Sequence, residues 1–418
     1  MAVFNNLPVK PNKLIKKSIA SFADQSTFSG ANFAINILFA RWMSVDNYGH
    51  FTMAYSVFLF WFFAVSALQL EPIAIFRHKE ENGAGDFLTA SLIATALLLV
   101  FLQLLFIPIY FLFFKAVDGF SPFPLFLACL GTGLFWTLRQ FSYADNRPWM
   151  AFIQTASYAI GLLAAAIFTG KSEVRSTDDG LLVLAEGAGI AVLAGLAIVR
   201  HSLVRFTLKR AYAIMVENVK YGIWSLPSNI AAWLAANIFL ITLPAYGNPE
   251  AGARLKTLLN ILLPFQQFLA GISLLFMPIL AKLHVSKNGL KFEKASKFLL
   301  IVGTSGGILM SIIMYFSGGK IYSFIYGGEY AKNSDIIIMG LALPVIMATI
   351  SIFRIITRAA NEPDKQFRAY LIGTLVVGSI AVPVGTAYGL TGSIVGMTVM
   401  QAVTLMVMVF DYRNRQPL

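Results

Sequence analysis

The stretch that decides the fold is residues 51–75, FTMAYSVFLFWFFAVSALQLEPIAI, in which Glu71 is the one charged side chain. A helix of about 20 mostly apolar residues crosses the hydrocarbon core of a bilayer. Stretches of this length and character recur eleven more times, at 18–40, 87–114, 121–141, 149–169, 180–200, 221–246, 255–281, 296–316, 334–354, 366–388 and 390–410. The sequence therefore predicts an all-α polytopic membrane protein with 12 transmembrane helices.

The positive charges between these stretches fall mainly on one side of the predicted membrane. When the connections are threaded alternately through the two faces, 24 of the 32 Lys and Arg residues lie on the face of both termini. The other face holds Arg41, Lys115, Lys171, Arg175, Arg254, Lys256, Lys320 and Lys332. Lys and Arg in short loops resist translocation, so the richer face is cytoplasmic. Both termini are predicted to be cytoplasmic.

The composition also indicates a membrane protein, whose surroundings are mostly lipid. It is 57% hydrophobic and 12% charged, with a formal net charge of +12. Basic loops such as 200–220 and 282–297 are predicted to contact anionic headgroups, so the charge requires no nucleic acid. The four histidines are far apart, at His50, His78, His201 and His284. No metal-ligand cluster or catalytic set is visible, and we expect a protein that is not an enzyme and has no cofactor.

The two halves of the chain echo each other. Three residues near the inner end of the fourth stretch recur 215 positions later near the tenth: Arg139, Asn146 and Pro148 correspond to Arg354, Asn361 and Pro363. This repeat predicts two six-helix bundles, residues 1–203 and 221–418, joined by a cytoplasmic linker at 204–220. Because each half has an even number of spans, the repeats should be parallel, and a substrate cavity is expected between them.

Polar side chains in hydrocarbon are expensive, and they usually face a cavity or another helix. They concentrate in the first two spans of each half, where the candidate cavity residues are Asp24, Asn32, Asn36, Gln69, Asn229, Asn237, Asn260, Gln266 and Gln267. The alternative is that the amides only form interhelical hydrogen bonds, each worth about 0.6 kcal/mol.

Asp24 lies about two turns inside the first span, and that helix carries no Lys or Arg one turn away. Burial disfavours an unpaired charge, which makes Asp24 a candidate proton or cation site. The alternative is a carboxylate near enough to the surface to stay hydrated or to pair with a loop lysine.

Five arginines at the ends of spans are candidate contacts for phosphate: Arg41 and Arg254 at the outer mouth, and Arg77, Arg139 and Arg354 at the inner one. The guanidinium fork suits phosphate. The alternative is that these arginines anchor the helices to lipid headgroups. No Lys or Arg falls in the middle third of any predicted span.

Two short motifs carry a family resemblance. Residues 39–51, FARWMSVDNYGHF, resemble the junction of the first two spans in polysaccharide flippases of the multidrug/oligosaccharidyl-lipid/polysaccharide (MOP) exporter superfamily. Residues 325–330, IYGGEY, are similar to a second pattern of that family. The span count and the six-plus-six duplication extend the resemblance over essentially the whole chain.

The resemblance implies a MATE-like fold in the bacterial cytoplasmic membrane. It implies a flippase that moves an undecaprenyl-pyrophosphate-linked oligosaccharide, an O-antigen or exopolysaccharide unit, by alternating access. Expected partners are membrane lipids, H⁺ or Na⁺ as coupling ion, and polysaccharide polymerase and chain-length proteins. In this family the first two spans of each half line a positively charged cavity, and this chain departs from that pattern because its central thirds lack Lys and Arg.

Two other functions remain open. A cation-coupled drug or metabolite antiporter of the same superfamily would favour a cavity without central basic residues. A membrane-embedded polymerase or ligase for lipid-linked sugars would need a large outer loop for its chemistry, and the predicted outer loops are short.

Overall fold

The computed structural model describes residues 11–77, 84–115, 119–170, 176–200, 208–286, 289–327, 330, 335–360 and 362–414. Within these ranges the chain is helical and contains no strand, which confirms the all-α prediction. The helices form two compact units. Unit 1 holds the described residues up to Trp42 together with Val57–Leu226, and unit 2 holds Met43–Ser56 and the described residues from Pro227 onward.

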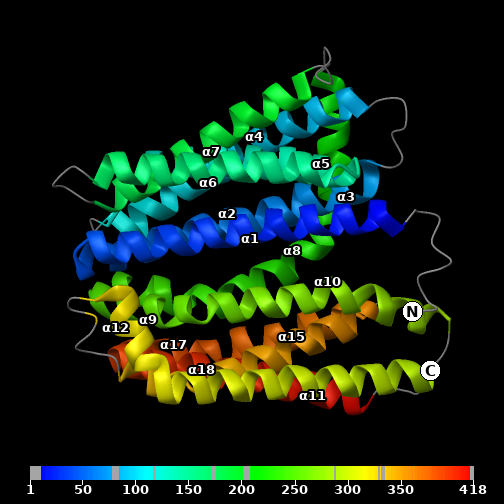
Figure 1. The fold of residues 1–418 in the computed structure, drawn as a ribbon. Coiled ribbons are helices and arrows are strands. Elements are labelled where there is room, and N and C mark those ends of the chain that lie inside the picture. Colours follow the sequence, from blue (N-terminus) through cyan, green and yellow to red (C-terminus); the bar gives the residue numbers. More distant parts are fainter. Residues whose placement is uncertain are drawn as a thin grey trace. The chain divides into compact units, whose positions relative to one another are not determined.

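The helices of unit 1 lie side by side, and each packs along one or more of the others (Figure 1). The unit contains α1 (Pro11–Trp42), the second part of α2 (Val45–Val65), α3 (Glu71–Phe76), α4 (Ala84–Ile109), α5 (Pro122–Ala144), α6 (Pro148–Gly170), α7 (Thr177–Val199) and the start of α8 (Leu208–Ala245). A π-helical turn, Ser66–Leu70, joins α2 to α3, and a second one, Tyr110–Phe114, extends α4. Helix α7 packs along α5 and α6, while α1 packs along α6.

Unit 2 contains the first part of α2, the rest of α8 and the later helices. These are α9 (Pro249–Ile261), α10 (Leu263–Val285), α11 (Gly289–Ile313), α12 (Gly319–Tyr326), α14 (Ile336–Met339), α15 (Leu343–Ala359), α16 (Pro363–Tyr370), α17 (Gly378–Ala387) and α18 (Gly389–Arg413). Helix α15 packs against α10 and α11, and α17 packs against α18. Two further π-helical turns, Met314–Gly318 and Leu371–Val376, precede α12 and α17.

Both α2 and α8 contribute to the two units. The predicted division at 204–220 follows the sequence repeat, whereas the compact units follow contacts. The first part of α2 lies in unit 2, where Gly49 is in close contact with the start of α9. A Cβ added at Gly49 would lie 2.0 Å from the Pro249 carbonyl oxygen, so only glycine fits there. This contact gives a physical reason for the glycine in the first family motif.

Eight helices among the described residues are long and apolar enough to cross a membrane, and two bent pairs raise the count to ten. The bent pairs are Pro249–Ile261 with Leu263–Ser273, at 46°, and Asp364–Val376 with Gly378–Ala387, at 42°. Helices α1 and α5 cover the remaining predicted spans, 18–40 and 121–141, without passing the same test. The chain is therefore a multi-pass membrane protein, and its two most polar predicted spans are α1 and α5.

The repeated residues lie at one kind of turn. After α5, the Asp145 amide donates to the Phe141 carbonyl at 2.9 Å and the Arg147 amide donates to the Ser142 carbonyl at 2.9 Å. After α15, at positions 215 residues later, the same two bonds recur: Ala360 to Ile356 at 3.0 Å and Glu362 to Thr357 at 2.9 Å.

Each turn is followed by a helix that begins with proline, Pro148 in α6 and Pro363 in α16. Proline suits this position because the first helical residues need no amide proton. Asn146 has a φ of 62°, in the left-handed region that asparagine tolerates better than most residues. Its counterpart, Asn361, lies outside the described residues.

Candidate functional site

Asp24 is the centre of a buried charge network in unit 1. Its carboxylate has no exposed surface and pairs with Arg139 of α5. The Arg139 Nε donates to both carboxylate oxygens, at 3.2 and 3.0 Å, and its Nη2 donates to Oδ2 at 2.6 Å. The Tyr143 hydroxyl also donates to Oδ2. Asp24 is therefore a paired, hydrogen-bonded carboxylate that ties α1 to α5.

The partner of Asp24 is neither a residue of α1 nor a loop lysine. It comes from a helix more than 100 positions away, so it could not be seen on α1 itself. Arg139 also donates to the Gln25 Oε1 at 3.1 Å, and its guanidinium lies 5.2 Å from the Phe28 ring centroid. The structure thus places this predicted phosphate contact on an internal carboxylate.

Aromatic side chains pack against the next turn of α1, on the C-terminal side of Asp24. The Phe28 ring lies 6.3 Å from Phe135, 6.5 Å from Trp136 and 5.7 Å from Tyr158. The Tyr158 hydroxyl donates to the Asn32 Oδ1 at 3.1 Å. The α1 stripe that carries Asp24, Phe28 and Asn32 therefore contacts α5 and α6 inside unit 1, and Asn32 forms an interhelical hydrogen bond.

Other predicted cavity amides bond to their own helices. The Asn36 Nδ2 donates to the Asn32 carbonyl at 2.8 Å, and the Asn237 Nδ2 donates to the Trp233 carbonyl at 3.0 Å. The Asn36 Oδ1 is buried without a partner among the described residues. Asn229 and Gln266 are half-buried, and Gln267 is exposed.

Gln69 lies in the π-helical turn after α2 and bonds to a residue that the sequence did not indicate. The Asn218 Nδ2 donates to the Gln69 Oε1 at 2.9 Å, and both side chains are fully buried. Asn218 precedes the predicted seventh span, so a hydropathy reading assigns it to a loop. In the structure α8 begins at Leu208, and Asn218 lies within it.

The boundary arginines fall into two groups. Arg77 pairs with Asp145 at 2.7 Å, Arg139 pairs with Asp24, and Arg254 pairs with Glu250 at 3.4 Å. Arg354 is half-buried on α15, and no carboxylate of the described ranges forms an ion pair with it. Arg41 is exposed at the end of α1.

A cluster of tyrosines lies beside the Lys256 stretch of α9 in unit 2. Lys256, on α9, is 8% exposed, and its Nζ lies 4.9 Å from the ring centroid of Tyr55. One turn further along α9, the Asn260 Nδ2 donates to the Tyr48 hydroxyl at 3.2 Å. Thr257 hydrogen-bonds to the Tyr322 hydroxyl at 2.9 Å. The sequence places Lys256 at the outer mouth, whereas the structure buries it.

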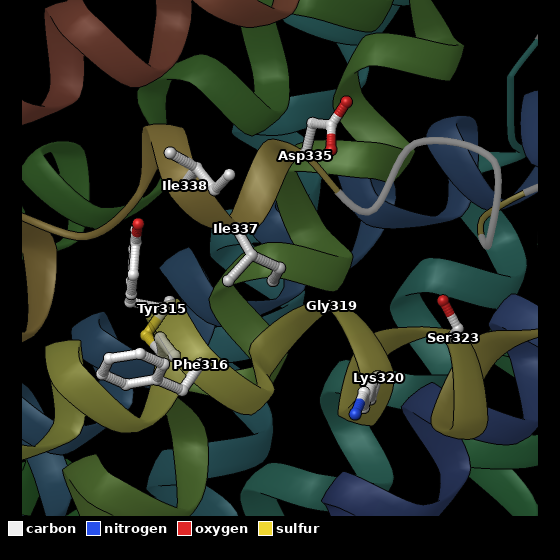
Figure 2. Close-up of a pocket in the computed structure, with 9 residues that line it drawn as sticks. Tyr315, Phe316, Gly319, Lys320, Ser323, Asp335, Ile337 and Ile338 are labelled. Carbon is white, nitrogen blue, oxygen red and sulfur yellow. The ribbon is translucent and has the colours of Figure 1, made fainter.

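Unit 2 also has an open pocket of about 430 Å³ between α12 and α14 (Figure 2). Figure 2 shows Lys320 on α12, Asp335 just before α14, and Ile337 and Ile338 on α14. The exposed rings of Tyr315 and Phe316 form one wall. The pocket is therefore an amphipathic surface feature with few polar groups.

Within the described ranges, no three His, Cys, Asp or Glu side chains gather as a metal site requires. No family model matches the chain. A capsular polysaccharide biosynthesis protein of Staphylococcus aureus is 28% identical over 150 residues, which are 35% of this chain and 37% of that protein.

Solved transporter structures match almost the whole chain. An inward-facing multidrug resistance MATE family transporter of the MOP superfamily gives a TM-score of 0.75 at 12% identity, over 93% of this chain and 94% of that one. The lipid II flippase MurJ, in an inward closed conformation, gives 0.69 at 15% identity, over 96% and 88%. A MOP superfamily transporter from Pyrococcus furiosus gives 0.67 at 15% identity, over 96% and 94%. The chain therefore has the fold of MOP superfamily transporters.

Proposed function

We propose that this chain is a flippase that moves an undecaprenyl-pyrophosphate-linked oligosaccharide across the bacterial cytoplasmic membrane. The proposal is supported by a structural similarity and a sequence similarity taken together. The fold is shared with a lipid II flippase over nearly the full length, and the sequence is similar to a capsular polysaccharide biosynthesis protein. Both termini would lie in the cytoplasm, and a polysaccharide polymerase and chain-length proteins would act on the product.

The substrate sets a physical requirement that the described residues help to meet. A diphosphate and a glycan need polar contacts along the path, while the lipid tail stays in hydrocarbon. Arg77, Arg139 and Arg254 are held by carboxylates, so they are poorly placed to bind a second anion. Arg354 has no such partner within the described ranges, and we propose it as the main inner contact for the diphosphate.

Asp24 favours a second candidate function, a cation-coupled drug or metabolite antiporter. The Asp24 carboxylate is buried and is bonded to Arg139 and Tyr143. A proton or Na⁺ that bound to this carboxylate would release it from its ion pair with Arg139. In a flippase, cation binding at Asp24 would couple glycan transport to an ion gradient. In an antiporter, it would drive the exchange of the cation for the drug or metabolite.

Deletion of the gene in its host tests the flippase proposal. We expect lipid-linked oligosaccharide to accumulate on the cytoplasmic leaflet and surface polysaccharide to be lost, because flipping follows glycan assembly and precedes polymerisation. The wild-type chain should restore the polysaccharide, and Arg354→Gln at equal protein levels should restore it only in part. Normal surface glycan together with sensitivity to cationic dyes would support the antiporter instead.

A further inference from the structure

Lys256 is a buried cation without a carboxylate partner. It is 8% exposed, and within the described ranges no acidic side chain forms an ion pair with it. The nearest acid on the same helix, Glu250, contacts Arg254 instead. Burial of an unpaired charge is unfavourable, and an ionisable group held inside a membrane protein commonly marks a functional site.

The neighbours of Lys256 on α9, Thr257 and Asn260, form hydrogen bonds with tyrosine hydroxyls. Tyr48 interacts electrostatically with Tyr55, Tyr326 and Tyr330, so these four phenols lie close together. The Tyr322 and Tyr326 rings are 5.2 Å apart, and the Tyr326 and Tyr330 rings are 5.8 Å apart. Hydroxyls of this kind can donate to an anion, but they do not neutralise an ammonium group.

The stacking of Lys256 on Tyr55 does not balance the charge. A cation–π contact is worth about 0.5–2 kcal/mol, whereas the desolvation of an ammonium costs several kcal/mol. A second group in the cluster is also unsatisfied, because the buried Tyr326 hydroxyl, which can donate to an anion, has no hydrogen-bond partner among the described residues. Both features are explained if the cluster is completed by a ligand.

We propose that Lys256 and the surrounding tyrosines form a binding site for a phosphate or diphosphate group. An ammonium offers three donors as a point charge, and lysine is a common ligand for phosphate. The identification of the anion as the diphosphate of the lipid carrier rests on the proposed function. The charge distribution of the sequence predicts that this end of unit 2 lies at the outer face, where the site would hold the headgroup before release.

The second family motif acquires a role from this site. Tyr326 and Tyr330 are the two tyrosines of IYGGEY, and Tyr48 belongs to the first motif, FARWMSVDNYGHF. Both motifs therefore supply phenols to the cluster around one lysine. Gly49, next to Tyr48, allows the close contact between α2 and α9 that brings Tyr48 to Asn260.

Binding of farnesyl diphosphate to the purified full chain in lipid nanodiscs tests the site. We expect saturable binding to the wild type and to Lys320→Met, which removes an exposed lysine of the same unit. Lys256→Met should weaken binding about tenfold or more, because a charge-assisted contact is lost. Methionine fills a similar volume and removes the cost of burial, so this variant should fold. Its elution volume and thermal unfolding check that it does.

Two further ligands identify the source of the anion. Farnesol, which lacks the charge, should bind equally to the wild type and Lys256→Met. If inorganic diphosphate competes with Lys256-dependent binding, the site recognises the free anion. If only farnesyl diphosphate binds, the site recognises the lipid-linked diphosphate. Unchanged affinity in Lys256→Met, or the absence of saturable binding to the wild type, would overturn the proposal. A wild-type chain that flips lipid-linked glycan under those conditions would show that this site alone had failed.

Discussion

The two halves of the molecule contain the same turn with an arginine seven residues before its asparagine, yet the two arginines have different surroundings. In unit 1, Arg139 pairs with Asp24 and stacks on aromatic rings. In unit 2, Arg354 occupies the corresponding place without a carboxylate partner in the part of the chain that the structure describes. The two halves therefore share the turn and the arginine, but only unit 1 has a carboxylate, Asp24, paired with that arginine in the described structure. We infer that Arg139 stabilises the fold, whereas Arg354 is available to a substrate.

The largest difference between the two sites should be in stability. Arg139→Gln leaves Asp24 buried without its counter-charge, and loss of one partner of a buried pair costs about 3–5 kcal/mol. We expect this variant to unfold at a much lower denaturant concentration in detergent micelles, or to fail to accumulate. Near wild-type stability would show that water or another group neutralises Asp24.

Removal of both charges sharpens the comparison. Asp24→Asn with Arg139→Gln replaces the ion pair with two neutral amides, and replacement of a whole buried pair is often nearly neutral. We expect the double variant to regain most of the stability lost by Arg139→Gln alone, measured in the same denaturant titration. Additive losses would mean that the two residues do not act as a pair.

The shared turn should show a smaller effect. Asn146 has a φ of 62°, and a residue with an ordinary Cβ costs about 1–2 kcal/mol in this region. Asn146→Ala should therefore lower the unfolding free energy by about 1 kcal/mol, while Asn146→Gly should leave it nearly unchanged. Equal losses in both variants would point instead to the hydrogen bond from Lys17 to Asn146.

Arg354 should show the smallest change in stability. Arg354→Gln breaks no ion pair in the described structure, so the unfolding free energy should change by less than about 0.5 kcal/mol. Surface polysaccharide should nevertheless fall, as measured in the complemented deletion strain. A large loss of stability would show that Arg354 stabilises the fold as Arg139 does. The two arginines would then not differ in role.

Hydropathy predicted the spans well because the thickness of the bilayer fixes their length. It predicted α10 less well, since 255–281 reads as one span but the structure breaks it at Leu262. Pro264 was the local signal for that break. The repeat was visible because each turn is followed by a helix that begins with proline, Pro148 and Pro363.

The contacts of the polar residues could not be predicted from the sequence, because they join segments that are far apart in the chain. Arg139 lies 115 positions from Asp24, and Asn260 lies 212 positions from Tyr48. Lys256 is predicted to be a boundary residue because it lies near the end of a span, whereas in the structure it is buried and contacts Tyr55 of α2. A single sequence shows which helices carry polar groups, but not which groups they meet.

Translocation in proteoliposomes tests the central claim most directly. Undecaprenyl-diphosphate-linked oligosaccharide is placed in the inner leaflet of vesicles that contain the purified chain, and its arrival outside is followed by digestion with an added glycosidase. We expect the wild type to expose the glycan far faster than protein-free vesicles, with Arg354→Gln much slower. Glycan exposure no faster than in protein-free vesicles, together with proton-driven uptake of a cationic dye, would contradict the flippase proposal.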